Sequence, residues 1–246
     1  MEPSTVRRWS WGLGISTMTA VAAFGVASWQ ANAAPPSPGA TPGAAAEQPR
    51  VSDPSAPPEP VAGTGSDPLT STEVGKARAV ALTPKLATGA RDVTGAAGPE
   101  YLSAEIAADS TVRRAELYFY DYRTDKLVKQ VVDLRTGKLT GSYSATGMQP
   151  PAAAREVDRA LDLVLAGPYA ADLRSRYAEA TGRALGGKAD LTVAAHIHHV
   201  RPADTVARSC GTHRCLQLVV QAADGQFIDF DDIIIDLSGR TVARLK

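Results

Sequence analysis

The sequence carries no excess charge of either sign. Its 246 residues include 26 lysines and arginines against 26 aspartates and glutamates. A protein that grips nucleic acid by its phosphates, or that docks on anionic lipid, needs a basic face, so this balance argues against both kinds of partner. Hydrophobic residues make up 44% of the chain, which is enough for a globular protein with a real core.

The familiar catalytic fingerprints are missing as well. The sequence has no G-x-S-x-G nucleophile elbow, no P-loop, no H-E-x-x-H helix and no dinucleotide-binding glycine pattern. Acidic pairs occur, but no spacing singles one out. We therefore expect a protein that is not an enzyme and has no catalytic residue.

The first 33 residues have the layout of a signal peptide. A short charged segment is followed by an apolar stretch over 11–28 that glycine, serine and threonine interrupt, and the A-x-A cleavage site then places Ala31 and Ala33 around Asn32. A membrane span needs ~20 solidly apolar residues, so an uncleaved anchor is the less favoured alternative. Cleavage leaves 24 basic and 25 acidic residues, a net charge of −1.

The segment 5–9, with its pair Arg7 and Arg8, resembles the twin-arginine signal sequences of bacteria. The low hydrophobicity of the stretch that follows fits the same family, whereas Ser10-Trp11-Gly12 departs from its usual continuation. We favour the twin-arginine (Tat) route over general secretion. The alanine and arginine bias is typical of a GC-rich bacterial genome, so we expect a secreted, extracellular bacterial protein.

A Pro/Ala-rich linker is predicted over 34–66. Nine of the 17 prolines lie in it, and it has no leucine and no large aromatic residue. Such a segment buries too little apolar area to offset its backbone entropy, so we expect it to be disordered, either as an idle linker or as a tether from a cell surface. Folding is expected to begin at Asp67.

Helices and strands then alternate in two similar series. Thr70 and Glu73 predict a capping box for a helix that ends by Pro84. Alternating apolar residues predict strands over 101–108, 115–120, 127–134 and 139–145. A second series has helices after Pro150-Pro151 and after Gly167-Pro168, and strands over 191–200, 215–222, 227–236 and 241–245.

The two series repeat one another. Glu73-Val74-x-Lys76-Ala77 matches Glu156-Val157-x-Arg159-Ala160, and the turn over 132–139 matches that over 235–242, with the aspartate and the glycine expected to hold the same places in both. We expect an internal duplication, with one unit at 67–148 and the other at 149–246. Each unit is predicted to be an α+β layer, in which a helix packs on a curled antiparallel sheet.

This helix-then-curled-sheet unit resembles the cystatin-like fold. The segment 67–74, DPLTSTEV, resembles the D-P-L-(T/S)-x-x-E-(I/V) opening of the N-terminal regions of copper amine oxidases, which carry two such units before the catalytic domain. The stretch 120–139 is similar to the same regions and to PepSY domains. The resemblance implies two tandem cystatin-like units over 67–245.

The oxidase active site itself has no counterpart. In that family the quinone cofactor forms from a tyrosine in an Asn-Tyr-(Asp/Glu) motif, and here Asn32 is the only asparagine. The copper histidines and the catalytic domain are also absent. The resemblance therefore implies a non-catalytic N-terminal region that stands alone.

Cys210 and Cys215 are the only cysteines. Two cysteines with four residues between them, located between two strands of an exported protein, predict a disulfide that closes the loop. A metal site and a redox pair are the alternatives, although the spacing is not C-x-x-C.

All four histidines fall between 196 and 213. On a strand, His196 and His198 point the same way, ~7 Å apart, and His213 in the cysteine loop could fold over them. Imidazoles beside sulfur suit copper or zinc, so these three are the candidate metal ligands. The alternative, which we favour, is an empty solvated face opposite the core residues Val193, Ala195 and Ile197.

Two further groups of residues each allow a structural and a functional interpretation. The aspartates 229, 231, 232 and 236 lack the spacing of a calcium loop and predict a solvated strand edge. Tyr118, Tyr120 and Tyr122 alternate with Leu117 and Phe119, so the other unit covers them or they form an exposed recognition surface.

We therefore expect a secreted, non-catalytic binding or regulatory protein whose partner is an extracellular protein. A copper- or zinc-binding protein that uses the histidine cluster is one alternative, and an inhibitor of a secreted enzyme is the other.

Overall fold

The computed structural model describes residues 61–108, 111–202 and 204–245. The predicted signal peptide, with Arg7, Arg8, Ala31 and Ala33, lies outside the described residues, and so does the predicted linker up to residue 60. Within the described ranges, no helix is long and apolar enough to cross a membrane.

The first half opens with a helix that is capped by its own side chains. α1 (Ser71–Ala81) follows Thr70, whose Oγ1 accepts the Glu73 N–H at 3.1 Å, while Glu73 Oε2 accepts the Thr70 N–H at 3.0 Å. The predicted capping box is confirmed. A short helix that the pattern did not predict, α2 (Pro84–Gly89), follows, and proline occupies its first turn, where no N–H is needed.

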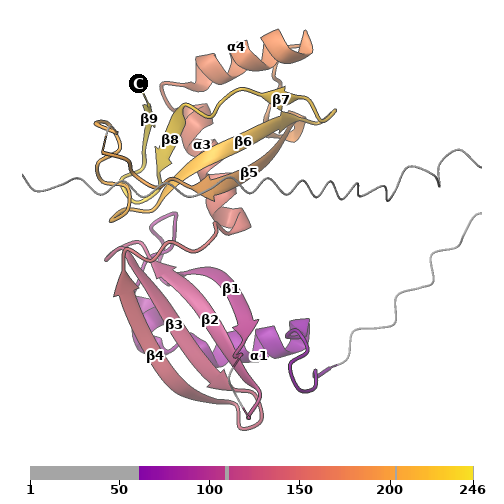
Figure 1. Ribbon diagram of the computed structural model, residues 1–246, viewed down its shortest axis with the longest axis vertical. Coiled ribbons are helices and arrows are strands. Elements are labelled where there is room, and N and C mark those ends of the chain that lie inside the picture. The colour runs from indigo at the N-terminus through magenta and orange to yellow at the C-terminus, as the bar shows by residue number, and fades with distance from the viewer. Residues whose placement is uncertain (1–60, 109–110, 203, 246) are drawn as a thin grey trace, which may run out of the picture. The chain divides into compact units, whose positions relative to one another are not determined.

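Four antiparallel strands complete the first half as a meander. They are β1 (Glu100–Ile106), β2 (Arg114–Asp121), β3 (Lys126–Asp133) and β4 (Lys138–Thr146), in the spatial order β1-β2-β3-β4. α1 lies across one face of this sheet (Figure 1) and buries Ala77 and Ala81 against Leu117, Phe119 and Val132. Among the described residues, no helix of the first half lies on the opposite face.

The second half begins with α3 (Ala154–Ala166) and α4 (Ala170–Thr181), which ends at Gly182 in the left-handed conformation, φ 69°. A short 3₁₀ turn, η1 (Lys188–Asp190), precedes the sheet. The sheet consists of β5 (Leu191–Ile197), β6 (Cys215–Ala222), β7 (Phe227–Ile228), β8 (Ile233–Asp236) and β9 (Thr241–Arg244). Its order is β5-β6-β8-β9, and β7 pairs with β6.

Two strand predictions in this half were too long. The predicted strand 227–236 is interrupted between β7 and β8, where Phe230 turns into the core and Arg176 binds Asp232. The predicted strand 191–200 stops at Ile197, because the chain turns where the Arg201 N–H bonds to Asp204 Oδ2 at 2.7 Å.

The two halves share one pattern of pairing. Arg114 faces Asp133 across β2 and β3, and Cys215 faces Asp236 across β6 and β8. The residue before each of these strands accepts an N–H from the leucine after each aspartate, at 3.1 Å from Leu134 and 2.9 Å from Leu237. Both halves therefore have two α-helices followed by four strands in the order of a meander, and the second half adds η1 and β7.

The glycines of the two matching turns are not equivalent. The left-handed position is Gly137 in the first turn, φ 64°, and Arg240 in the second, φ 53°. Gly239 is required for a different reason. A Cβ at this position would lie 2.7 Å from the Asp236 carboxylate, which accepts the Gly239 N–H. The predicted correspondence of the aspartates is found, whereas that of the glycines is off by one residue.

The described residues thus form a mixed α+β fold with antiparallel sheets of four and five strands. The larger core lies between α3, α4 and the second sheet, and it also includes Val93 and Tyr122 from the first half.

Candidate functional site

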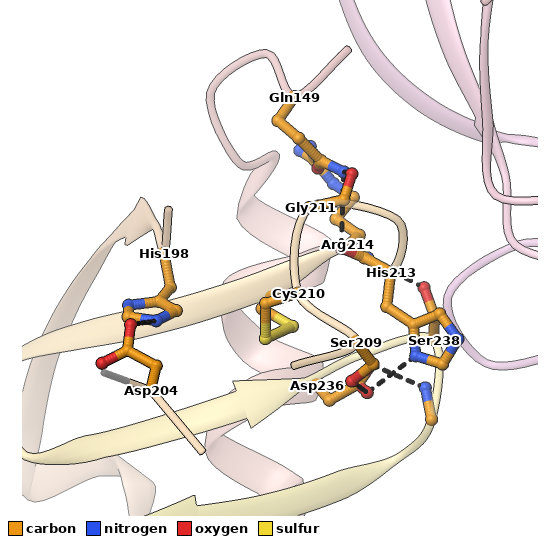
Figure 2. Close-up of a disulfide and its surroundings, with 12 residues drawn as sticks. Gln149, His198, Asp204, Ser209, Cys210, Gly211, His213, Arg214, Asp236 and Ser238 are labelled. Atoms are coloured by element: carbon orange, nitrogen blue, oxygen red, sulfur yellow. Dashed lines mark hydrogen bonds and ion pairs between the residues drawn. A yellow bond between two sulfur atoms is a disulfide. The ribbon is translucent and has the colours of Figure 1, made fainter. Parts of the chain in front are cut away.

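The cysteine loop is closed as predicted. Cys210 and Cys215 form a disulfide with Cα atoms 5.4 Å apart, and both residues are buried (Figure 2). Cys215 is the first residue of β6, so the crosslink fixes the approach to that strand. Two residues inside the loop, His213 and Arg214, point in toward other parts of the protein.

Arg214 is the most deeply buried cation of the described residues, with no exposed surface. Its Nε and Nη2 donate to the two oxygens of Glu156 at 2.6 and 2.8 Å, and Glu156 is fully buried too. The same guanidinium donates to Gln149 Oε1 and to the carbonyls of Pro150 and Pro151. Each nitrogen of the buried guanidinium therefore donates to at least one acceptor, as a buried ion pair requires.

The tyrosines of the first half contact this pair. Tyr122 donates its hydroxyl to Glu156 Oε1 at 2.5 Å, and the Arg214 guanidinium carbon lies 5.2 Å from the Tyr120 ring centroid. Burial, reinforced by the Glu156 charge, raises the pKa of Tyr122. Tyr120 and Tyr122 are thus covered by the second half, whereas Tyr118 is half-buried and donates to Glu116.

The first half contains the same device. Arg113 donates from Nε and Nη2 to both oxygens of Glu73 at 2.8 Å. It also donates to the carbonyls of Gly65, Asp67 and Pro68 ahead of the helix. The hydrogen bond from Arg113 is the chief cause that lowers the Glu73 pKa to about 2. In each half, an arginine just before the second strand clamps the helix capping glutamate and the segment that leads into the helix.

Sequence reasoning singled out Glu73 and Glu156 in the helix pattern, but it identified neither arginine and did not predict the two ion pairs. The sequence contains the information that relates the two pairs. Glu73 and Glu156 occupy equivalent positions in the repeated helix pattern, and Arg113 and Arg214 each directly precede a strand of the repeat. Aligning the two halves past their helices would have brought the arginines together as a pair.

The candidate metal ligands have separate surroundings. His196 on β5 is exposed, with Nε2 2.9 Å from Gln217 Oε1. His198 follows the end of β5 and is 5% exposed; its Nε2 lies 3.2 Å from Asp204 Oδ2, an ion-pair separation without hydrogen-bond geometry. Burial is the main cause that lowers the His198 pKa. His196 is thus exposed on β5, whereas His198 is buried just past the end of that strand.

His213 points to the opposite side of the disulfide from His198 (Figure 2). Its Nδ1 lies 2.8 Å from Asp236 Oδ2, and this hydrogen bond raises the His213 pKa. Across 61–108, 111–202 and 204–245, no three histidine, cysteine, aspartate or glutamate side chains are grouped as a metal site. The core face expected for β5 is present, since Val193, Ala195 and Ile197 pack on the larger core, between α3, α4 and the second sheet.

The C-terminal aspartates serve different purposes. Asp229 is solvated, with a side chain 86% exposed. Asp232 accepts both Arg176 Nη1 and Nη2, at 2.9 and 3.0 Å, and pairs with Arg244 at 3.0 Å. Asp236 is buried, and its carboxylate is hydrogen-bonded to His213 of the disulfide loop. The predicted solvated edge describes the first of these residues and not the other two.

An open face remains on the first sheet, on the side away from α1. Glu116, Lys129 and Tyr143 line a cavity of about 460 Å³ there. Lys129 lies 3.0 Å from Glu116 Oε1 and 5.7 Å from the centroid of the Tyr143 ring. Tyr143 is 60% exposed and Met148 is 55% exposed, and both line an adjoining cavity of about 280 Å³. Exposed aromatic and apolar side chains beside polar groups are typical of a surface that binds another molecule.

Comparison with known proteins finds a weak structural similarity. No protein-family model matches the chain, and no curated protein sequence matches it. Among solved structures, it is similar to a copper-containing benzylamine oxidase from Hansenula polymorpha, with a TM-score of 0.39 and 11% identity over 74% of this chain. The chain spans 29% of that oxidase's length. The chain thus has a weak structural neighbour among the copper amine oxidases.

Proposed function

We propose that this chain is an exported, non-catalytic binding or regulatory protein made of two cystatin-like units. The unit boundaries follow the repeat, with one unit over 67–148 and the other over 149–246. A helix ahead of a four-strand meander, found twice in the same order, supports the assignment. The paired clamps Arg113–Glu73 and Arg214–Glu156 support a duplicated origin.

The open face of the first sheet is the observation that carries the binding role. A sheet with one face packed and the other exposed is ordinary, but this exposed face holds Tyr143, Met148 and two adjoining cavities. The buried charges described above are each matched within the fold, which is the arrangement of structural ion pairs. A protein with such a face and such a core acts by contact with a partner.

Capture of a secreted partner tests this role. The mature protein from Ala34 onward is immobilised, incubated with culture medium of the producing organism, and any captured protein is identified and its affinity measured with purified components. We expect Tyr143→Ser to weaken that affinity at least tenfold, which corresponds to about 1.4 kcal/mol. Phe227→Ser in the second half is the matched control, because Phe227 is 65% exposed.

Two results would contradict the proposal. One is the absence of any captured partner at micromolar protein concentrations. The other is turnover of benzylamine or another primary amine by the purified protein, followed as hydrogen peroxide release.

Export is tested separately. We propose that Arg7→Lys with Arg8→Lys retains the protein inside the cell, because the Tat route requires the arginine pair, and that the secreted form begins at Ala34. Secretion that is unaffected by the substitutions would assign the chain to general secretion.

A further inference from the structure

The outer edge of β4 is open. β4 pairs with β3 from Lys138 to Thr146, apart from an irregularity at Thr140, and no strand of the described residues pairs with its other side. Exposed edge strands are normally blunted by charges or proline. From Leu139 to Thr146 the strand has neither, and Thr140, Tyr143 and Thr146 are residue types that favour strands. The edge therefore presents a row of backbone donors and acceptors that can accept another strand.

Cavities adjoin β4 on both faces of the sheet. On the open face, Gly141 and Tyr143 line the cavity of about 460 Å³, and Ala145 lines the cavity of about 280 Å³. On the helix face, Ser142 and Ser144 line a third cavity of about 300 Å³ that also reaches α2. Successive side chains of an added strand point to opposite faces, so each side chain meets a cavity.

The helix-face cavity holds a polar atom that lacks a partner. Gln130 is 3% exposed and lines this cavity, and its Oε1 accepts no hydrogen bond from the described residues. A buried acceptor without a donor is costly, and a ligand that supplies the donor removes this cost.

The charge at this cavity is positive. Lys85 and Arg123 are exposed and line it. Asp121 is the one carboxylate among the described lining residues, and its Oδ1 already accepts the backbone N–H groups of Arg91 and Arg123 at 2.9 and 3.0 Å. An incoming carboxylate would therefore meet two cations.

We infer that the β4 edge binds an extended peptide segment of a partner protein as a fifth strand. Toward the helix face, the segment places a neutral hydrogen-bond donor at Gln130 and, two residues away, an acidic side chain near Lys85 and Arg123. Toward the open face, it places apolar side chains near Tyr143 and Met148. This assignment rests on the proposed binding function and gives it a partner chemistry.

A second copy of the chain fits this edge less well. Antiparallel pairing of two β4 strands puts the helix faces of both sheets on one side, so Lys85 and Arg123 of one copy approach the same residues of the other. The helix-face residues Ser142 and Ser144 of a second β4 bring no carboxylate to offset that repulsion.

The test uses a library of labelled heptapeptides that carry Leu, Val or Phe at odd positions and Ser, Asn or Glu at even positions. The mature protein is titrated with each, and backbone amides are followed by NMR. We expect binders whose shifts centre on 138–146. N-methylation of alternate peptide nitrogens in one frame should weaken binding about tenfold or more, and the other frame should leave it unchanged, because only one set of N–H groups faces β4.

Three variants separate binding from stability. Gln130→Leu should weaken the best peptide about tenfold and leave the urea midpoint unchanged or higher, because it removes an acceptor that has no partner in the free protein. Lys85→Glu with Arg123→Glu should weaken glutamate-containing peptides and spare those that carry only serine or asparagine. Arg208→Glu, an exposed site in the second half, is the control and should change neither quantity.

The inference is overturned if no library member binds, if the shifts lie outside 138–146, or if Gln130→Leu lowers the urea midpoint without changing peptide affinity. A concentration-dependent dimer that protects 138–146 would assign the edge to a second copy instead. Capture of a secreted partner that leaves 138–146 unprotected would refute this inference alone, whereas the absence of any captured partner would refute the proposed function.

Discussion

Replacing Arg214 with methionine isolates the clamp of the second half. The substitution keeps most of the apolar stem and removes the guanidinium, so Glu156 loses its two charged donors, at 2.6 and 2.8 Å. Glu156 has no exposed surface, and water cannot replace those donors. Two uncharged donors still bond to Glu156 in this variant, the Tyr122 hydroxyl at 2.5 Å and the Ala153 N–H at 2.8 Å.

The cost follows from that burial. Removing one partner of a buried ion pair destabilises a protein by about 3–5 kcal/mol, and the two remaining hydrogen bonds place our expectation near the low end, at about 3 kcal/mol. Arg113→Met is the matched comparison. Its pair has side chains 13% and 8% exposed, so water can approach Glu73 and we expect a cost of about 1–2 kcal/mol.

Urea unfolding at pH 7 measures both costs. Far-UV circular dichroism is the suitable probe, because all three tryptophans precede residue 34 and are lost with the signal peptide. Adding Glu156→Gln to Arg214→Met should recover part of the loss, since it removes the unpaired charge. A loss below about 1 kcal/mol for Arg214→Met, or one no larger than that for Arg113→Met, would refute this reasoning.

Three further perturbations have defined outcomes. The Glu73 pKa is held at about 2, so its contribution is complete above the ordinary value of 4.5 and is lost as pH falls toward 2. Glu73→Gln should therefore lower the urea midpoint at pH 6 and have little effect at pH 2. Replacing Cys210 and Cys215 with serine opens a short loop and should cost about 2 kcal/mol in urea unfolding; an unchanged midpoint would contradict a stabilising crosslink. The His213 pKa is raised above 6.5, so its bond to Asp236 stabilises the protein below that pH, and the stabilisation is lost as pH rises through the folded-state pKa. An NMR titration that places the His213 pKa below 6.5 would contradict this account.

Local patterns predicted much of the fold. The Thr70 and Glu73 capping box is read within one turn of chain, and the alternation of Leu117 and Phe119 with polar neighbours is read within one strand. Both features appear in the structure because a cap and a sheet face depend on residues close in sequence.

Tertiary contacts account for the errors. The break between β7 and β8 depends on Arg176, which reaches Asp232 from a helix 56 residues earlier. The early end of β5 depends on the turn at Arg201. The β-branched residues on either side of each site, Ile228 and Ile233 in one case and Ile197 and Val200 in the other, favour a strand by themselves, so the sequence pattern did not mark either interruption.

The buried clamp was hidden for a different reason. An arginine in a sequence is read as a surface residue, because charged side chains are seldom fully buried unless they are paired. Arg214 bonds to Glu156, which lies 58 positions earlier in the sequence. Only the equivalent pair Arg113 and Glu73 in the other half indicates that this arginine is part of a repeated ion pair. The histidines show the converse, since four of them within 18 residues of sequence do not form one site among the described residues.

Hydrogen exchange of the mature protein with and without its captured partner tests the central claim most directly. The account predicts slowed exchange in Lys138–Thr146 and little change in the second sheet. Slowed exchange confined to residues 191–244, with 138–146 unaffected, would contradict it.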